Sequence, residues 1–384
     1  MPSSGKSGKR ERELSLFQID AGLEWRGGQR QAFFLARELQ RRGTPFKFVV
    51  QPDSPLHVKA TEAGLPVLPL RMKNEFDLWA ILRLAGAMRR AKCRLAHFHD
   101  AHGLSVGSAA ASLARVPIRV ISRRVDFPIK SLRKYVKNID AVIAISEEVK
   151  KVLVQGGVPD RLVEVVPSGI DFEPFREVKE KDFLRREFGF TPDDYLVGIV
   201  AQLEDHKGHR DLIDAAKILK DHAPKIKIVI VGEGSLRMSL DQQAHELKVD
   251  DIVYFLGFRE DVPRILASLD LFVLSSRMEG LGSSLMDAMA SRLPVVATQA
   301  GGIPEVVIHR ETGLLVPPRD PLALAQAILK VYLDKPLANR LARRGFEVVH
   351  EKFSAEAMAR KIILIYERLA SQKGVQIGGQ SPNP

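Results

Sequence analysis

The chain has almost no cysteine, since Cys93 is the single one among 384 residues. One thiol excludes an internal disulfide and is typical of a protein that works in a reducing compartment. Cys93 stands within a basic, apolar segment of helical character, so we interpret it as a structural residue. The composition therefore argues against a secreted, disulfide-stabilised scaffold.

Long hydrophobic runs are also missing. No apolar segment approaches the roughly 18 to 20 residues that span a bilayer. The start of the chain, MPSSGKSGKRERE, is charged, and the short SLFQID segment behind it is not the hydrophobic stretch of a signal peptide. We therefore expect a cytoplasmic protein.

Aromatic residues make up only 7% of the chain, which leaves little for stacking on bases. The chain has 58 Lys and Arg against 47 Asp and Glu, so its net charge is +11. Such a charge attracts nucleic acid, anionic lipid headgroups or phosphorylated substrates, and it does not choose among them. Because no nucleic-acid-binding module is recognisable, we expect no nucleic acid among the partners.

A length of 384 residues exceeds the usual size of a single core, and a hydrophobic content of 45% suffices for two. Short apolar runs alternate with helical patterns in two series. The first series is 14–19, 46–50, 67–70, 95–98, 119–122, 141–145 and 163–166, and the second is 196–201, 226–231, 253–256, 271–274 and 295–298. Strands that alternate with helices predict parallel sheets. We expect an α/β fold of two doubly wound, Rossmann-like domains that face an inter-domain cleft.

The segment Pro167–Asp182 combines proline, glycine and charge without a strand period, so we place the domain boundary there. Both ends of the chain are rich in Ser, Gly, Pro and Lys, and we expect them to be disordered. The expected units are a disordered start at 1–12, a first domain at 13–172, a second domain at 173–352, a C-terminal helix at 353–371 and a disordered tail at 372–384.

The segment Ser275–Glu305 is the most informative part of the chain. The apolar run Leu271–Leu274 ends shortly before Glu279, a helix is predicted to begin at Ser283, and Asp287 follows one turn later. The start of a helix favours a phosphate, whereas the carboxylates on either side of it are suited to accept hydrogen bonds from hydroxyls. A ligand that combines phosphate with several hydroxyl groups fits a sugar nucleotide. The alternative is an ordinary buried strand–helix unit in which Ser283 caps the helix and Asp287 is a surface acid.

Glycines follow the first predicted strand. Gly27 and Gly28 immediately precede a helical pattern, so a ligand can approach the backbone closely at the start of that helix. The pattern is not G-x-G-x-x-G, so a nicotinamide cofactor is poorly supported. The alternative is a turn without a ligand.

Histidines follow the predicted strand 95–98. His97, His99, Asp100 and His102 stand together at its end. A metal is one interpretation, but His97 and His99 share a face only while the chain stays extended, and no other Cys or His cluster is near in sequence. We favour one histidine placed against a sugar.

Lys207 stands in a loop between the predicted strand 196–201 and a helix that begins near His209. It offers a flexible point charge to a diphosphate, and its alternative role is that of a solvated surface lysine. The segments 231–237 (VGEGSLR) and 257–262 (GFREDV) repeat this arrangement, and either backbone groups or Phe258 can contact a nucleobase there.

Together these segments resemble the large GT-B retaining glycosyltransferases of family 4, the glycosyltransferase group 1 proteins. The resemblance extends from about Phe17 to about Glu367. Its motifs, in order, are WRGGQ, HFHD, VPSGID, HKGH, VGEG, LGF, the acid pair of Glu279 and Asp287, and AGGIPE. Each motif alone is weak, but their joint order and spacing are specific.

The resemblance implies a site residue by residue. Three positions are implied as catalytic, namely His99, Lys207 and Glu279. The implied donor-binding positions are Gly27, Gly28, Gln202, Phe258, Gly282, Ser283, Ser284 and Asp287. In this picture His99 lies beside the donor sugar, Lys207 neutralises the diphosphate, Glu279 holds sugar hydroxyls, Asp287 binds the ribose and Phe258 meets the base. The last helix, around 355–369, is implied to cross back onto the first domain.

The implied reaction moves a sugar from a nucleoside diphosphate to an acceptor hydroxyl with retention of configuration, in lipopolysaccharide, cell-surface polysaccharide or glycolipid synthesis. The diphosphate takes the acceptor's proton, so no dedicated base is needed. Two aspartates never stand two positions apart, so the D-x-D pair that many other transferases use for a metal is absent. We therefore expect neither a metal nor another cofactor.

Two positions depart from the family pattern. Gln202 stands near where the family usually has an arginine, and Asp287 replaces a glutamate. A lost charge-assisted hydrogen bond costs about 1.5 to 3 kcal/mol, so donor binding is expected to be weaker. The alternatives that stay open are a catalytically silent sugar-nucleotide binder and a non-transferase GT-B enzyme such as a sugar-nucleotide epimerase.

A basic helical face is predicted from Lys130, Arg133, Lys134 and Lys137, whose spacing is i, i+3, i+4 and i+7. Such a face docks on anionic lipid and brings an enzyme to a lipid-linked acceptor on the inner face of the cytoplasmic membrane. The alternative is a solvated charged helix, and the acceptor is expected to be a glycan or a lipid-linked molecule.

Overall fold

The computed structural model describes residues 16–176, 178 and 180–376. In this part of the chain the first sheet has seven parallel strands in the order β3-β2-β1-β4-β5-β6-β7. Its strands are β1 (Leu16–Asp20), β2 (Phe46–Val50), β3 (Val67–Pro69), β4 (Leu95–Phe98), β5 (Ile118–Arg123), β6 (Ala141–Ala144) and β7 (Val163–Val165). Strands β1, β4 and β6 are buried along their whole length, as in parallel sheets covered by helices on both faces.

The second sheet repeats this plan. Its order is β10-β9-β8-β11-β12-β13, again parallel throughout the described residues. Its strands are β8 (Tyr195–Val200), β9 (Ile226–Val231), β10 (Val253–Gly257), β11 (Leu271–Leu274), β12 (Val295–Thr298) and β13 (Leu314–Val316). The predicted fold class, two doubly wound α/β domains, is therefore confirmed, and β13 is the strand that the sequence patterns did not predict.

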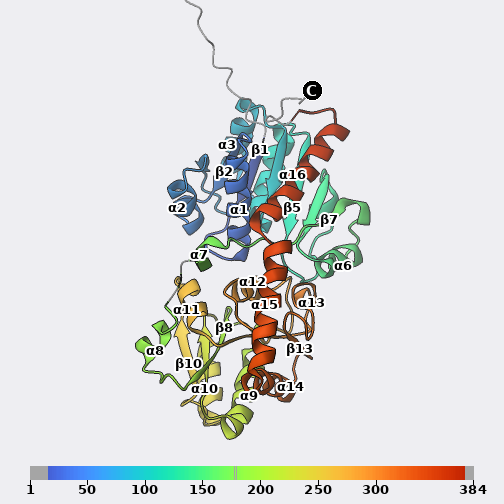
Figure 1. Cartoon of the computed structure of the whole chain (residues 1–384). Helices are drawn as coiled ribbons and strands as arrows, with labels where there is room; N and C mark the ends of the chain where they lie inside the picture. The colour runs from blue at the N-terminus through green and yellow to red at the C-terminus, as the bar shows by residue number, and fades with distance from the viewer. Residues whose placement is uncertain (1–15, 177, 179, 377–384) are drawn as a thin grey trace, which may run out of the picture.

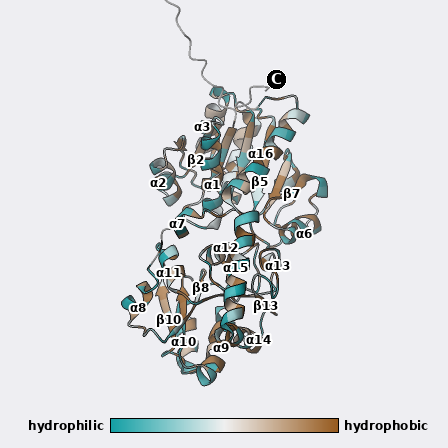
Figure 2. Ribbon diagram, viewed as in Figure 1, coloured by the Kyte–Doolittle hydropathy of each residue, from teal (hydrophilic) through white to brown (hydrophobic). Residues whose placement is uncertain are grey.

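Helices cover both sheets (Figure 1). The first domain holds α1 (Gly27–Arg41), α2 (Pro55–Glu62), α3 (Leu78–Arg90), α4 (Ala101–Leu113), α5 (Arg133–Val136) and α6 (Glu147–Gln155). The linker and the second domain hold α7 (Glu173–Arg176), α8 (Phe183–Phe188), α9 (His209–His222), α10 (Arg237–Glu246), α11 (Val262–Ser268), α12 (Ser283–Ala290), α13 (Ile303–Val306), α14 (Pro321–Leu333) and α15 (Lys335–Lys352). Helix α15 shows much teal, as expected for a helix with one face exposed to solvent (Figure 2).

The last helix, α16 (Ala355–Gln372), returns to the first domain. Figure 1 shows it in red beside α1, away from the second sheet. Its buried residues Ile362 and Tyr366 belong to the same apolar cluster as Leu35 of α1. The chain crosses between the domains at Ile170, whose N–H donates to the carbonyl of Phe353 at 2.7 Å. Two chain crossings at one place therefore join the domains.

The predicted basic face is wrong. Helix α5 is a single turn, Arg133–Val136, and both Lys130 and Lys137 lie outside it. Lys134 is paired with Glu75 at 2.6 Å. The spacing i, i+3, i+4, i+7 shares a face only on a continuous helix, so these cations do not share the predicted helical face. Among the described residues, no helix is both long and apolar enough to cross a membrane.

Candidate functional site

Each sheet reverses its strand order at one point, and ligands of doubly wound sheets bind outside the carboxyl ends of the strands there. In the first domain this point lies between β1 and β4, which lead to Gly27 and His99. In the second it lies between β8 and β11, which lead to Lys207 and Glu279. The topology therefore delivers four of the predicted residues to the two places where such folds bind ligands.

Lys207 and Glu279 meet at the second of these points. The Lys207 Nζ lies 2.7 Å from the Glu279 Oε2, and Ser276 Oγ donates to the same oxygen at 3.3 Å. Both side chains keep some access to solvent, with exposed fractions of 18% and 14%. The pair is a partly buried ion pair, and each partner retains hydrogen-bonding capacity for a ligand.

The loop that carries Lys207 is held in place by Gly208, the next residue. Its φ is +68°, and a Cβ there would lie 2.0 Å from the carbonyl oxygen of Ser275. Ser275 Oγ in turn donates to the carbonyl of Lys207 at 3.1 Å. Only glycine permits this contact, which fixes the lysine loop against the end of β11 and so against Glu279.

Helix α12 begins at Ser283, as the sequence predicts, and its N-cap Gly282 makes no side-chain cap bond. Its first N–H groups are therefore left for a ligand. The start of α1 approaches it from the first domain, because a Cβ at Gly27 would lie 3.5 Å from Ser283 Oγ. Two helix starts, each with a positive end, thus face one region between the domains.

Asp287 lies in that region but is already paired. Arg30 of α1 donates Nη1 to its Oδ2 at 2.7 Å and Nη2 to its Oδ1 at 2.9 Å. The carboxylate is predicted to bind ribose hydroxyls, and the structure pairs it with a guanidinium of the other domain. A carboxylate has about four lone-pair directions, so two remain for hydroxyls.

His99 is the predicted residue whose position differs most from the expectation. Its side chain is buried, its Nε2 is 3.0 Å from Gln18 Oε1, and its Nδ1 is 3.1 Å from a guanidinium nitrogen of Arg124. Burial lowers the pKa of His99 well below its usual value, and the neighbouring His97 and Arg124 act in the same direction. Both ring nitrogens are therefore engaged within the first domain, and the place of His99 beside the donor sugar stays a prediction.

The metal alternative for the histidine cluster has no support in the geometry. His97 Nε2 is 2.8 Å from Ser122 Oγ, and its Nδ1 contacts the hydroxyl of Tyr366 on α16. Asp100 caps α4 through the N–H groups of His102 and Gly103. Over the ranges that the structure describes, no group of three or more His, Cys, Asp and Glu is arranged to hold a metal.

Three further predicted residues lie close to the ends of strands or to the start of α1. Phe258 directly follows β10 and is 60% exposed. Gln202 follows β8 and is exposed. Gly28 faces Arg124, whose Cδ lies 3.9 Å from the position of a Cβ at Gly28.

The sequence patterns missed three polar residues near the site, namely Arg30, Arg124 and Asp126. Arg124 and Asp126 directly follow β5, whose carboxyl end lies at the same sheet edge as those of β1 and β4. Burial raises the pKa of Asp126, and the charge of Glu279 adds to this while Lys207 opposes it. The signal that was available is the polar run Arg123–Asp126 at the end of a predicted strand.

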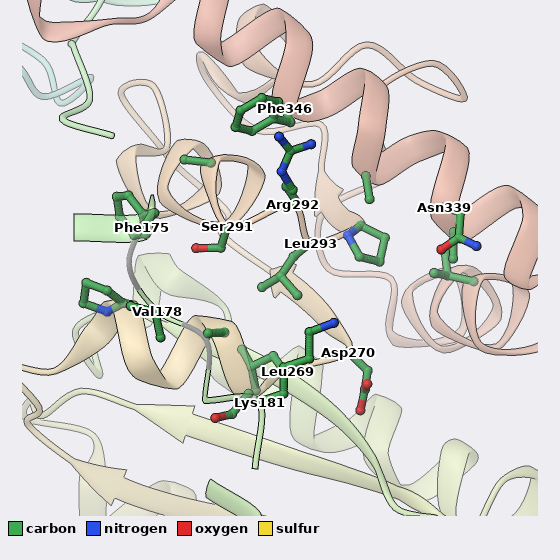
Figure 3. A pocket seen from close by; sticks show the side chains of 18 of the residues that line it. Phe175, Val178, Lys181, Leu269, Asp270, Ser291, Arg292, Leu293, Asn339 and Phe346 are labelled. Atoms are coloured by element: carbon green, nitrogen blue, oxygen red, sulfur yellow. The ribbon is translucent and has the colours of Figure 1, made fainter. Parts of the chain in front are cut away.

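A cavity of about 880 Å³ lies elsewhere. It borders Tyr195, Asp270 and Pro294, which stand at the amino ends of strands, and the linker closes one side of it. Figure 3 shows Arg292 beside the ring of Phe346 on its wall, with its guanidinium carbon 3.7 Å from the ring centre. Because ligands of these sheets bind at the carboxyl ends of strands, this cavity is not the predicted site.

The two doubly wound domains, with the candidate site at their facing switch points, define a protein of the GT-B class. The family model for Glycosyltransferase Family 4 matches residues 25–174, and the model for Glycosyl transferases group 1 matches residues 180–348. The chain therefore belongs to the group 1 glycosyltransferases, as the resemblance predicts.

Relatives agree with this classification. The putative glycosyltransferase EpsD of Bacillus subtilis is 32% identical over 212 residues, which cover 54% of this chain and 55% of that protein. The N-acetyl-alpha-D-glucosaminyl L-malate synthase of Bacillus anthracis is 28% identical over 239 residues, which cover 62% and 61%. The chain thus matches between about half and two thirds of the length of these relatives.

A solved structure shares the whole fold. Anabaena HepE in complex with UDP-glucose superimposes with a TM-score of 0.82 at 22% identity, covering 92% of this chain and 100% of the other. At this level of identity the similarity shows the fold. It places both domains in one known architecture.

Proposed function

We propose that the chain is a retaining glycosyltransferase that moves a sugar from a nucleoside diphosphate to an acceptor hydroxyl. The observation that carries the proposal is the Lys207–Glu279 pair, 2.7 Å apart, beside the uncapped start of α12. An ammonium and free N–H groups suit a diphosphate, whereas a carboxylate suits sugar hydroxyls. HepE, which shares the fold, is bound to UDP-glucose in its structure, and this supports a nucleotide sugar as donor.

In the proposed reaction the bond between the anomeric carbon and the diphosphate oxygen breaks, and a bond to the acceptor oxygen forms on the same face of the sugar. The acceptor's proton passes to the leaving diphosphate. Negative charge grows on that diphosphate in the transition state, so Lys207 and the N–H groups at Ser283 lower the barrier. Glu279 holds hydroxyls of the donor sugar, and the free lone pairs of Asp287 hold those of the ribose.

The acceptor class is part of the proposal. We expect a glycan or a lipid-linked molecule of the cell envelope, and the net charge of +11 suits phosphorylated or anionic acceptors. No metal is needed in the proposed step, since the ammonium and the helix start neutralise the diphosphate.

The first experiment is a thermal-shift screen of UDP-, GDP- and ADP-sugars, because a ligand that binds the folded state raises its melting temperature. The donor found in this way is then assayed for transfer and hydrolysis with Lys207→Met and Glu279→Gln. We expect Lys207→Met to lower kcat by about 100- to 1,000-fold. Glu279→Gln is expected to lower kcat/KM by about 10- to 150-fold, the cost of a charged hydrogen bond.

The matched control is Glu246→Gln, a surface carboxylate of the same domain that accepts from Gln242 at 2.8 Å. It should leave the kinetics unchanged. Donor binding without transfer or hydrolysis would indicate the silent relative, and a new sugar nucleotide formed without acceptor would indicate an epimerase. Absence of any shift with all three classes of sugar nucleotide contradicts the proposal.

A further inference from the structure

Arg124 occupies the junction of the two domains. It follows β5 directly, and its Cδ lies 3.9 Å from the position of a Cβ at Gly28 in the first domain. Its own carbonyl oxygen lies 2.8 Å from the position of a Cβ at Gly280, the residue after Glu279 in the second domain. Arg124 therefore touches both the glycine loop and the acid loop of the candidate site.

The chain after Arg124 continues across the second domain. The ring of Phe127 lies 5.5 Å from the ring of His206, the residue before Lys207. Between these two anchors, the carboxyl of Asp126 is close enough to Glu279 and Lys207 for their charges to act on its pKa. The segment 124–127 thus lies near the ion pair of the site, on its first-domain side.

The Arg124 guanidinium has no carboxylate partner within ion-pair distance in the described ranges. Its hydrogen bonds go to neutral acceptors, the carbonyl of His99 at 2.8 Å and the Nδ1 of the same residue at 3.1 Å. Arg277 of the second domain, in contrast, bonds both oxygens of Asp211 at 2.8 and 3.0 Å. An arginine has five N–H donors, so most of those on Arg124 remain for another acceptor.

Burial lowers the pKa of Arg124 to about 10, although the carboxyls of Asp20 and Asp100 oppose this effect. The side chain therefore stays charged at neutral pH, and no carboxylate of the described residues balances its charge at ion-pair distance. A buried cation is stabilised strongly when an anion accepts hydrogen bonds from its remaining N–H groups.

His99 holds this guanidinium in place. Because Arg124 donates to Nδ1, the proton of the neutral imidazole is on Nε2, which donates to Gln18 Oε1 at 3.0 Å. The backbone carbonyl of His99 accepts a second bond from the same guanidinium. His99 acts in this arrangement as a positioning residue for Arg124.

We propose that Arg124 is a diphosphate-binding residue of the donor site, which contacts the anion from the first domain while Lys207 contacts it from the second. The inference rests on the proposed function, because that function supplies the diphosphate. A diphosphate carries more than one negative charge, and the helix starts at Gly27 and Ser283 supply partial charges only. The two cations, one from each domain, close the site around it.

The test uses inorganic pyrophosphate as the probe, because the base of the donor is not part of the inference. Its affinity for the full chain is measured by titration calorimetry at low salt. Arg124→Gln and Arg124→Met are expected to weaken binding by about 10- to 100-fold, as for loss of a charge-assisted hydrogen bond. Arg124→Lys should recover part of the loss, because the charge returns without the two-pronged geometry.

The matched control is Arg292→Gln, which removes another arginine without a carboxylate partner in the described ranges, one that stacks on Phe346 at the distant cavity. It should bind pyrophosphate as the wild type does. Thermal unfolding shows which of the two neutral replacements, Arg124→Gln or Arg124→Met, is folded. The affinity of that folded variant for pyrophosphate decides the test.

The outcomes separate the two proposals. A wild type that binds pyrophosphate, together with a folded neutral variant that binds equally well, overturns the role of Arg124 and leaves the proposed function intact. A wild type that binds neither pyrophosphate nor any sugar nucleotide overturns both. With a donor in hand, the loss should appear in kcat as well as in KM, because charge on the diphosphate grows in the transition state.

Discussion

Arg30 and Asp287 join the two domains through a two-pronged ion pair, with bonds of 2.7 and 2.9 Å. Arg30 stands on the first helix of the first domain, and Asp287 stands on α12 of the second. The exposed fractions of the two side chains are 23% and 7%, so the pair is screened much less than a surface pair. It therefore holds the domains together at the mouth of the candidate site.

The first prediction concerns this pair. In a double-mutant cycle, Arg30→Met and Asp287→Asn should show a coupling energy of about 1 to 3 kcal/mol in chemical unfolding. The control cycle uses the exposed pair Arg360 and Glu356, 2.9 Å apart, whose coupling should be about 0.5 kcal/mol or less. Additive effects at Arg30 and Asp287 would show that the pair does not join the domains. Small-angle scattering should also give a larger radius of gyration for Arg30→Met.

The second prediction concerns Gly301, whose backbone packs against the backbone of Glu279. Its φ is +52°, and a Cβ there would lie 2.0 Å from the carbonyl oxygen of Glu279. Gly301→Ala should move the acid loop and lower kcat/KM for the donor by more than about 100-fold. Gly64→Ala serves as control, because Gly64 has a φ of +66° and open space around it. Both variants carry the strain of about 1 to 2 kcal/mol for a left-handed alanine, so only a change in activity confined to Gly301→Ala fits the prediction.

The third prediction concerns pH. Burial raises the pKa of Asp20 from 3.8 to about 6, and the nearby Asp100 adds to this. The unfolded chain loses the proton of this carboxyl first, so the contribution of Asp20 to stability is fully present below pH 3.8 and is lost as the pH rises to about 6. The loss is on the order of 3 kcal/mol.

Asp20→Asn removes this titration and keeps an oxygen to accept from Gly22 N–H, which donates to Asp20 at 2.8 Å. The free energy of unfolding, measured in denaturant between pH 4 and 7, should fall less with pH in the variant than in the wild type. Equal slopes in the two proteins would count against a raised pKa of Asp20.

The fourth prediction concerns Glu305, whose carboxylate reaches from α13 to the first domain. It accepts from the N–H groups of Glu147 at 2.9 Å and Glu148 at 3.1 Å, at the start of α6. Capping of this kind contributes about 1 kcal/mol, so in Glu305→Ala these two amides should exchange hydrogen about fivefold faster. Glu311→Ala, which removes a surface partner of Arg344, should leave their exchange unchanged.

The sequence predicted most of the fold because the relevant signals are local. The apolar runs of the two series became strands, and the helix expected at Ser283 begins there. A buried parallel strand needs a continuous apolar run, and a helix start after a glycine has a short, recognisable signature. The strand Leu314–Val316 was missed because it is short and stands between a turn and a proline segment.

The site was predicted only in part. Lys207 and Glu279 meet, because both lie in loops that follow strands at a switch point. The ion pair of Arg30 and Asp287 joins residues 257 positions apart in the sequence, and no local sequence pattern indicates a contact over such a separation. The hydrogen bond between His99 and Arg124 was also out of reach, since a histidine at a strand end faces either the cleft or the core depending on what packs above it.

The sequence by itself determined the two parallel sheets, the sheet edges at which the candidate site lies and the family, since these follow from the order of apolar runs, glycines and charges along the chain. Only the tertiary structure decided which charges meet across the domains. Helix α5 ends after one turn, Asp287 is paired with Arg30, and His99 lies beneath Arg124. The physical reason is that hydrophobic periodicity acts over a few residues, whereas ion pairs and buried hydrogen bonds depend on how two separately folded cores are placed against each other.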